Sequence, residues 1–274
     1  MSAQCARRAY VLGLEFWASR LPGWEVAASI LSGECAAPDL ATTRPTFDLL
    51  APTERRRAPD TVAIALAVAS RACQMAGVDP KVTPSVFAST CGDLSISDYM
   101  NSTLASTPTL VSPIRFHNSV HNAAAGYWSI GTGSHAPYTA ITAYSDTFGE
   151  GMLEALVQAH HEEVPILLSA YDIEARGPAA TIVPNRGIIG AGLVLATQPG
   201  TRHIASIEWR TITGSDRTLP LERNLALVGQ HAMAACLPVF ELIAERRAGI
   251  VRLGLSPNLL LEIEFDFPRN PDEK

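Results

Sequence analysis

Short apolar runs alternate along the chain with segments of helical periodicity, and this alternation predicts an α/β fold. The predicted strands are residues 10–17, 85–90, 138–142, 164–172, 187–197, 202–212 and 258–265. The predicted helices are residues 23–33, 60–77, 94–106, 119–133, 146–161 and 221–249. The run at 164–172 is continuously apolar, which is typical of a strand covered on both faces. We therefore expect a mixed sheet covered by helices.

Local signals predict how two of these helices begin and pack. Asp60 is placed to cap helix 60–77, because an aspartate side chain accepts hydrogen bonds from the first free N–H groups of a helix. Helix 119–133 has an Ala-Ala-Ala-Gly centre, and such small residues let another backbone approach closely. We therefore expect helix 119–133 to be deeply buried.

The last third of the chain carries two further predictions. Strands 187–197 and 202–212 follow one another closely and are expected to pair antiparallel. Helix 221–249 contains Pro238, which is expected to bend it, because proline removes a backbone hydrogen bond inside a helix.

Composition and charge narrow the class of protein. Of the 274 residues, 47% are hydrophobic and 18% are charged, so the chain is globular, and its sparse surface charge favours a buried oligomeric face. The net charge of −6 argues against nucleic-acid binding, which depends on Lys and Arg. The longest apolar stretch, residues 61–70, is shorter than the roughly 20 residues that a membrane span needs, and the N-terminus lacks the pattern of a secretory signal. We expect a cytoplasmic protein without nucleic-acid or membrane partners.

The cysteines indicate free thiols in a reducing compartment. There are five of them, an odd number, and no Cys-x-x-Cys pair occurs. They are Cys5, Cys35, Cys73, Cys91 and Cys236.

Metal and cofactor motifs are weak. His117 and His121 are spaced so that both imidazoles can face one side of a helix, but the glutamate of a His-Glu-x-x-His motif is absent. Asp93 and His135 are only conceivable third ligands, so we expect core positions or the lining of a pocket or interface rather than a metal site. The glycines of residues 187–192 lie in a predicted strand and open no helix, so they form no dinucleotide fingerprint. We expect no metal and no cofactor.

The candidate site is the corner where strand 138–142 turns into helix 146–161. Ser145 at this corner could act as a nucleophile, but the flanking glycines of a Gly-x-Ser-x-Gly elbow are absent. We therefore expect Ser145 or Asp146 to cap the helix. Cys91, after strand 85–90, could be a reactive thiol or a small buried residue.

Several segments in order resemble the N-terminal half of the β-ketoacyl synthases, the condensing enzymes of the thiolase fold. The segments are PSVFASTCGD at 84–93, SVHNAAAGYWSIGTGSHAPYTAITAYSDTFGEGMLEAL at 119–156, VPILLSAYD at 164–172 and GIIGAGLVLA at 187–196. More narrowly, the combination is similar to the short synthase-like proteins found with aryl-polyene pigment clusters. The resemblance implies a thiolase-like layered α/β fold. It implies a synthase N-terminal-like domain at residues 1–197, with a truncated extension of helix and strand at 198–274 packing on the same core.

The chain departs from this family at the nucleophile. The family's corner reads Thr-Ala-Cys, and the cysteine carries the acyl chain as a thioester, whereas here the corner reads Thr142-Ala143-Tyr144. A phenol with a pKa of about 10 cannot serve as that carrier. The family's C-terminal half also supplies histidines for decarboxylation, but only His203 and His231 follow Ala196, and neither has the family's sequence context.

The resemblance and its departures together imply a catalytically silent subunit, similar to a chain-length factor. Such a subunit pairs with a full-length ketosynthase and shapes its acyl tunnel in fatty acid, polyketide or aryl polyene biosynthesis. The family's dimer is built partly from the strand at 138–142, so the resemblance places Tyr144 at a tunnel, where an aromatic ring limits chain length. The residues expected to line a pocket or the interface are Cys91, His117, His121, Tyr138 and Thr142.

Two alternatives remain open. One is an independent acyltransferase or thioesterase that uses Ser145 or Cys91 with His121. The other is a non-catalytic homodimer that binds an acyl carrier protein. Carrier proteins are usually acidic, so the net negative charge is unfavourable to this reading, and residues 55–57 are the one obvious basic cluster.

Overall fold

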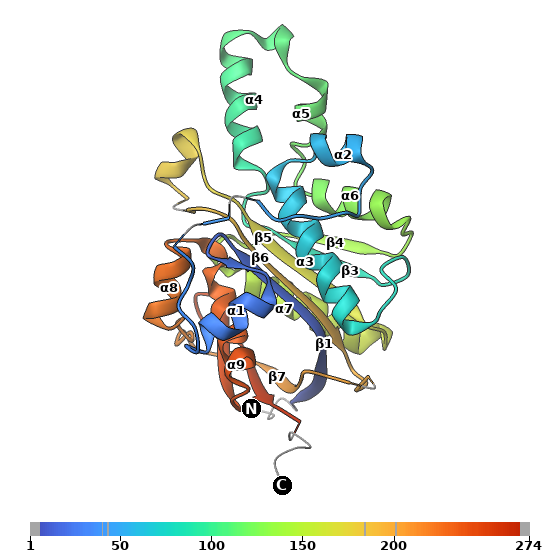
Figure 1. Ribbon diagram of the computed structural model, residues 1–274, viewed down its shortest axis with the longest axis vertical. Helices are drawn as coiled ribbons and strands as arrows, with labels where there is room; N and C mark the ends of the chain where they lie inside the picture. The colour runs from blue at the N-terminus through green and yellow to red at the C-terminus, as the bar shows by residue number, and fades with distance from the viewer. Residues whose placement is uncertain (1–5, 40, 43, 184, 201, 269–274) are drawn as a thin grey trace.

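The computed structural model describes residues 6–39, 41–42, 44–183, 185–200 and 202–268, which form one mixed sheet with helices on both faces (Figure 1). The strand order is β4-β3-β5-β6-β1-β7-β9-β8, and β2 pairs with β1. The strands are β1 (Arg7–Ala18), β2 (Leu21–Pro22), β3 (Ser85–Ala88), β4 (Tyr138–Ile141), β5 (Ile166–Asp172), β6 (Ile189–Ala196), β7 (Ala205–Thr213), β8 (Gly249–Ser256) and β9 (Leu259–Asp266).

Nine α-helices and four short 3-10 turns complete the described part of the chain. The α-helices are α1 (Trp24–Leu31), α2 (Pro52–Arg57), α3 (Asp60–Ala76), α4 (Leu94–Ser106), α5 (Pro113–His117), α6 (Ala123–Thr132), α7 (Thr147–Glu162), α8 (Glu222–Val228) and α9 (Leu237–Glu245). The 3-10 turns are η1 (Pro108–Leu110), η2 (Tyr144–Asp146), η3 (Gly177–Thr181) and η4 (Ala232–Cys236). None of the described helices is long and apolar enough to cross a membrane.

The sheet separates two hydrophobic cores. Helices α3 and α6 pack on one face, and α7, α1 and α9 contribute to the core on the other. Strand β3 runs parallel to both β4 and β5, whereas β5, β6, β1, β7, β9 and β8 pair antiparallel in turn, so the predicted mixed sheet is confirmed. Every residue of β5 and β6 is buried, as the continuous apolar runs predict.

Strand β8, which follows β6 and β7 in the chain, packs against the start of helix α7. A Cβ added to Gly149 of α7 would lie 2.1 Å from the carbonyl oxygen of Gly254 in β8, so the two backbones approach this closely because residue 149 is a glycine. Helix α7 also contacts β3 and β5, and it is therefore enclosed between the first strands of the sheet and the last ones.

Two predictions for the last third of the chain are wrong. Strands β6 and β7 do not pair with each other, because the 12-residue strand β1 lies between them and pairs with both. The predicted helix 221–249 is broken into α8, η4 and α9. The break follows Gly229, whose φ of +69° ends α8, and Pro238 lies in the first turn of α9 instead of bending it. Residues 249–256 form strand β8.

Two smaller predictions also need correction. Asp60 does not cap α3, because Pro59 occupies the N-cap position and the Asp60 carboxylate pairs with Arg44 at 3.3 Å. Helix α6 begins at Ala123 and is buried only on one side. No atom lies within 4 Å of a Cβ added to Gly126, so the expected close backbone contact is not made among the described residues.

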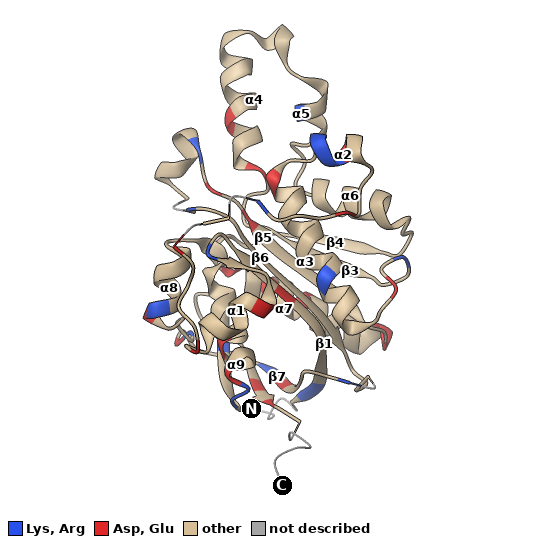
Figure 2. Ribbon diagram, in the orientation of Figure 1, with Lys and Arg blue, Asp and Glu red and all other residues tan. Residues whose placement is uncertain are grey.

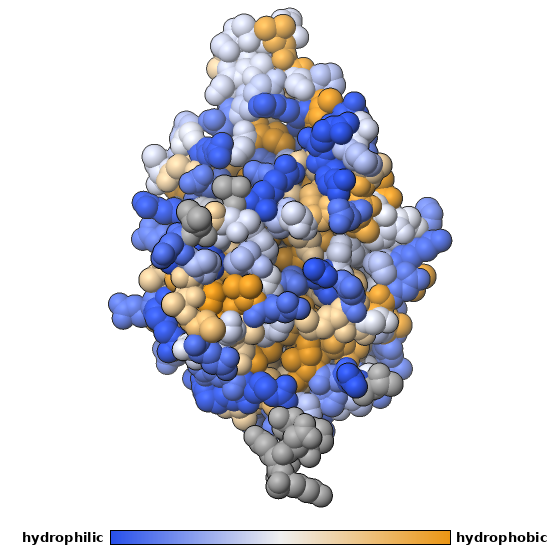
Figure 3. Space-filling view, viewed as in Figure 1, coloured by the Kyte–Doolittle hydropathy of each residue, from blue (hydrophilic) through white to orange (hydrophobic). Residues whose placement is uncertain are grey.

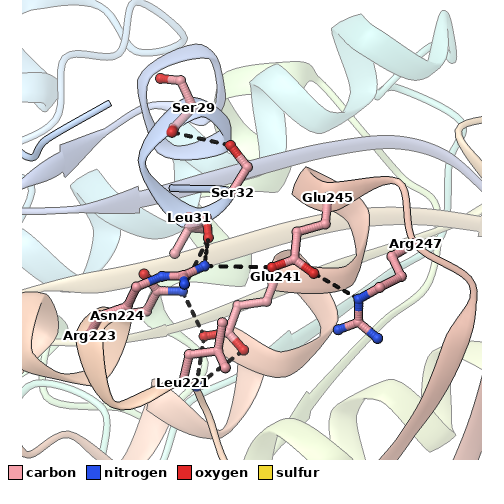
Figure 4. Close-up of polar contacts among 9 residues, drawn as sticks. All are labelled: Ser29, Leu31, Ser32, Leu221, Arg223, Asn224, Glu241, Glu245 and Arg247. Atoms are coloured by element: carbon pink, nitrogen blue, oxygen red, sulfur yellow. Dashed lines mark hydrogen bonds and ion pairs between the residues drawn. The ribbon is translucent and has the colours of Figure 1, made fainter. Parts of the chain in front are cut away.

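A buried carboxylate joins the C-terminal helices to helix α1 (Figure 4). Glu241 of α9 accepts hydrogen bonds from the backbone N–H of Leu221 at 3.0 Å and from Asn224 Nδ2 at 2.9 Å. The same amide nitrogen lies 3.3 Å from the carbonyl oxygen of Leu31 in α1. Burial raises the pKa of Glu241, and the two donors partly oppose that rise.

The described cysteines are all free thiols, of which Cys73 and Cys236 are buried in the cores. Burial raises the pKa of the Cys73 thiol to about 12. Cys5 lies outside the described residues.

Candidate functional site

Strand β4 turns into helix α7 through a sharp corner, residues 142–147, which we call the elbow. Tyr144 has a φ of +52°, in the left-handed region that costs a residue with a side chain roughly 1–2 kcal/mol. Its side chain is 62% exposed. A strained strand-to-helix turn that presents one side chain at a helix N-terminus is the geometry of a nucleophile elbow.

The hydroxyl of Thr147 holds the elbow together. It donates to the carbonyl oxygen of Tyr144 at 2.8 Å and accepts from the backbone N–H of Ala143 at 3.0 Å. The prediction that Ser145 or Asp146 caps α7 is wrong, since neither side chain bonds an N–H of the helix. Ser145 is exposed, and its Oγ lies 3.5 Å from Asp146 Oδ1.

Asp146 is instead paired with an arginine from the distant chain segment between β7 and α8. Arg217 Nη1 and Nη2 donate to the two carboxylate oxygens of Asp146 at 2.5 and 3.3 Å. The segment is fixed to β8, because the backbone N–H of Thr218 donates to the carbonyl oxygen of Arg252 at 2.9 Å. The Arg217–Asp146 ion pair fits only because residue 254 has no side chain, since a Cβ there would lie 2.5 Å from the guanidinium carbon of Arg217.

A buried carboxylate, Asp172, supports the loop next to the elbow. Its Oδ1 accepts from Ser89 Oγ at 2.7 Å and from the backbone N–H of Thr90 at 3.0 Å. Burial raises the pKa of Asp172 to about 6, against the lowering effect of these hydrogen bonds. Thr142 joins the elbow to the same loop, because its hydroxyl donates to the carbonyl oxygen of Thr90 at 2.8 Å.

Cys91 and His121 lie beside this loop but are not arranged as a nucleophile and base. His121 Nε2 lies 2.8 Å from the carbonyl oxygen of Ser89. Burial and the nearby charge of Asp172 raise the pKa of the Cys91 thiol, whereas a nucleophilic thiol needs a lowered one.

The other predicted positions have ordinary structural contacts. His117 is exposed and lies edge-on to Tyr127, with ring centroids 6.4 Å apart. Tyr138 of β4 is 41% exposed and accepts a hydrogen bond from Asn122 at 3.2 Å. Asp93 accepts from Ile96 N–H and the Thr61 hydroxyl, so it caps α4. No group of three potential metal ligands occurs within the described ranges.

The two histidines of the C-terminal segment differ in setting. His203 lies edge-on to Tyr10. His231 is buried immediately before η4, the turn that contacts η2 of the elbow, and burial lowers its pKa to about 4. Arg217 and Asp172 were missed in the sequence. Arg217 stands 71 residues from its partner, and Asp172 reads as the end of an apolar strand.

The sequence matches a known protein family over most of its length. Residues 32–215, well over half of the chain, match the family described as the N-terminal domain of β-ketoacyl synthases. No curated protein matches the sequence of this chain.

Solved structures share the fold. A chain in the complex of the ketosynthase ApeO with its chain length factor ApeC, from Xenorhabdus doucetiae, is similar with a TM-score of 0.70 and 15% identity, over 95% of this chain and 100% of that one. For the ishigamide ketosynthase/chain length factor the TM-score is 0.68 and the identity 14%, over 95% of this chain and 99% of that one. For AntDE:AntF, described as an acyl-carrier protein in complex with its ketosynthase, the TM-score is 0.72 and the identity 9%, over 96% of this chain and 100% of that one. The expected thiolase-like layered fold is confirmed by these similarities.

Proposed function

Because the chain belongs to the family of the β-ketoacyl synthase N-terminal domain, we propose that it is a non-catalytic subunit, similar to a chain length factor. In this proposal it pairs with an active ketosynthase in fatty acid, polyketide or aryl polyene biosynthesis. The observation that carries the proposal is Tyr144, which stands at the left-handed corner of an elbow that keeps its strained geometry. The backbone that presents a nucleophile is present, and a phenol stands where a thiol is needed.

The described residues around the elbow offer no substitute nucleophile. Ser145 Oγ has Asp146 and no described histidine as a hydrogen-bond partner, and His121 Nε2 is bonded to the carbonyl oxygen of Ser89. The raised pKa of Cys91 keeps its thiol protonated at neutral pH. These contacts do not favour an independent acyltransferase or thioesterase.

The pairing surface that we propose is the β4 end of the sheet. Strand β4 is the last strand on its side, so its outer edge is free to pair within the part of the chain that the structure describes. Ile130 of α6 is 69% exposed and Tyr138 of β4 is 41% exposed, and both are large hydrophobic residues. An edge strand flanked by exposed apolar residues fits sheet continuation across a subunit interface.

Helices α4 and α5 project from the body as an arm above this end of the molecule (Figure 1). The arm carries almost no charge (Figure 2), and it exposes Leu104, Leu110, Ile114 and Phe116. Burying such residues against a partner removes apolar surface from water, at about 25 cal/mol per Å². We include the arm in the proposed pairing surface.

In the paired state, Tyr144 is proposed to line or close an acyl tunnel. The exposed ring rises from a corner that is pinned on both sides by the bonds of Thr142 and Thr147. A side chain held in this way can stop a growing chain sterically.

An acyl carrier protein is proposed to contact mainly the ketosynthase partner. Within the basic run of helix α2, Arg55 is paired with Asp48, and Arg57 lies 3.7 Å from Glu54. Much of the positive charge there is therefore already neutralised.

Pairing is tested by co-expressing the chain with full-length ketosynthases of the same genome that keep the cysteine, followed by size-exclusion chromatography with light scattering. The expected result is a stable one-to-one complex. Ile130→Asp should weaken it, whereas Ile250→Asp, on the 46% exposed isoleucine of strand β8, should not. A homodimer that excludes every ketosynthase, or acyl transfer by the chain alone, would refute the proposal.

The tunnel role is tested within that complex. Tyr144→Ala should lengthen the products detected by mass spectrometry, whereas Tyr144→Phe, which keeps the ring, should leave their length unchanged. If both variants gave the product lengths of the wild-type complex, Tyr144 would not line the tunnel.

A further inference from the structure

A cavity lies away from the elbow, between helix α3 and the start of helix α1. It has a volume of about 460 Å³, which is within the range of small-ligand sites. Helix α3 forms one wall, and residues of β1, the end of β2 and the start of α1 form the other. Apolar surface is visible between α1 and α3 on this face of the molecule (Figure 3).

The floor of this cavity holds a carboxylate, Glu15 of β1. Its Oε1 accepts the backbone N–H groups of Trp24 and Phe16. This bonding has a structural reason, because α1 begins after Gly23, which has no side chain to cap the helix. A glutamine would accept the same two bonds, so capping alone does not call for a charge.

The second oxygen, Oε2, has no hydrogen-bond partner among the described residues, and it is not sealed off from the cavity. Arg71 of α3 is the one described cation whose charge acts on Glu15, and it forms no direct ion pair with the carboxylate among the described residues. Burial raises the pKa of Glu15. A half-buried carboxylate with no cation in direct contact is unfavourable, and a cationic ligand at Oε2 would remove that disadvantage.

The walls suit an organic cation. Trp17 and Trp24 line the cavity, and indole rings attract ammonium groups through their electron-rich faces. Ala67 and Val68 of α3 add apolar wall.

The rim adds a second point of recognition. Arg71 of α3 lies at the rim, and its Nη1 donates to Gln74 Oε1 at 3.0 Å, so its remaining N–H groups can serve a ligand oxygen. The basic residue of α3 and the acidic residue of α1 both lie on this face (Figure 2).

From these features we infer that the cavity binds a small α-amino carbonyl compound with an apolar side chain. Its ammonium group would meet Glu15 Oε2, its carbonyl oxygen would meet Arg71, and its side chain would lie against Trp17 and Trp24. The inference does not depend on the function of the elbow, because no residue of 142–147 lines this cavity.

The test is calorimetric titration of the purified chain, alone and with its partner, using L-phenylalaninamide and N-acetyl-L-phenylalaninamide. The two ligands share body and carbonyl groups, and only the first carries the ammonium charge. We expect saturable binding of the first, accompanied by a change in tryptophan fluorescence, and at least 10-fold weaker binding of the second.

Glu15→Gln keeps the cap of α1 and removes the charge, so it should abolish the preference for the charged ligand at an unchanged melting temperature. Glu25→Gln is the matched control, because Glu25 lies at the same cavity but is exposed. Equal affinity of the wild-type chain for the two ligands, no saturable binding at millimolar concentration, or full preference in Glu15→Gln would each overturn the inference. The ligand comparison on wild-type protein decides the matter even if a variant folds poorly.

Discussion

Replacing Asp172 with asparagine tests whether a buried carboxylate beside the elbow makes stability depend on pH. The variant keeps an oxygen that can accept the hydrogen bonds of Ser89 Oγ and Thr90 N–H, and it removes the titratable group. The loop next to the elbow should therefore keep its conformation, and only the linkage to protons should change.

The magnitude follows from the two pKa values. Burial moves the pKa of Asp172 from 3.8 to about 6 in the folded chain. Between these values the unfolded chain has released the proton and the folded chain still holds it, so stability falls as pH rises. A difference of about 2 pH units corresponds to about 3 kcal/mol of folding free energy. This stabilisation is fully present below pH ~4 and is lost once the pH passes the pKa of Asp172 in the folded chain.

The assay is urea unfolding of wild type and Asp172→Asn, followed by circular dichroism from pH 3.5 to 7.5. The free energy of unfolding of wild type, minus that of the variant, should fall by about 3 kcal/mol across this range. Other carboxylates titrate in both proteins and cancel in the difference. Glu208→Gln, at an exposed carboxylate paired with Arg8, should show no comparable slope. A difference that is flat or rises with pH would refute the reasoning.

Three other substitutions test the same structure. As pH falls from 6.5 to about 4, wild type should lose about 3 kcal/mol of stability, because the unfolded chain takes up a proton on His231 that the buried imidazole resists. His231→Asn should not show this loss in the same unfolding series. Tyr144→Gly should raise the free energy of unfolding by about 1 kcal/mol in thermal melts, because glycine adopts a φ of +52° without strain, and an unchanged or lowered value would contradict this. Gly254→Ala should lower it by roughly 1–3 kcal/mol, because the new Cβ collides with the elbow ion pair, whereas Gly126→Ala has open space and serves as its control.

Local patterns in the sequence were enough to find the elements around the elbow. The β-prone run at 138–142, the corner and the helix that follows are all present as β4, η2 and α7, because each depends on residues close together in the chain. Strand neighbours were not predictable in the same way. Nothing near β6 shows that β1, more than 170 residues earlier, separates it from β7.

The errors in the last third have a related cause. The apolar residues of α8, η4 and α9 follow each other with few polar interruptions, so they read as one helix that ends at residue 249. Gly229 marks the end of α8, and strand β8 was not predicted. The partner of Asp146 could not be predicted, because Arg217 approaches it only after β8 has packed against α7.

The left-handed corner at Tyr144 has a consequence at the level of the gene. Tyrosine and cysteine codons differ by a single base, and the backbone at this position already has the bend that presents a side chain at the N-terminus of α7. The dipole of helix α7 would lower the pKa of a thiol at this position. One point mutation therefore separates this chain from one with a cysteine at the same corner, and the rest of the elbow would not have to be rebuilt.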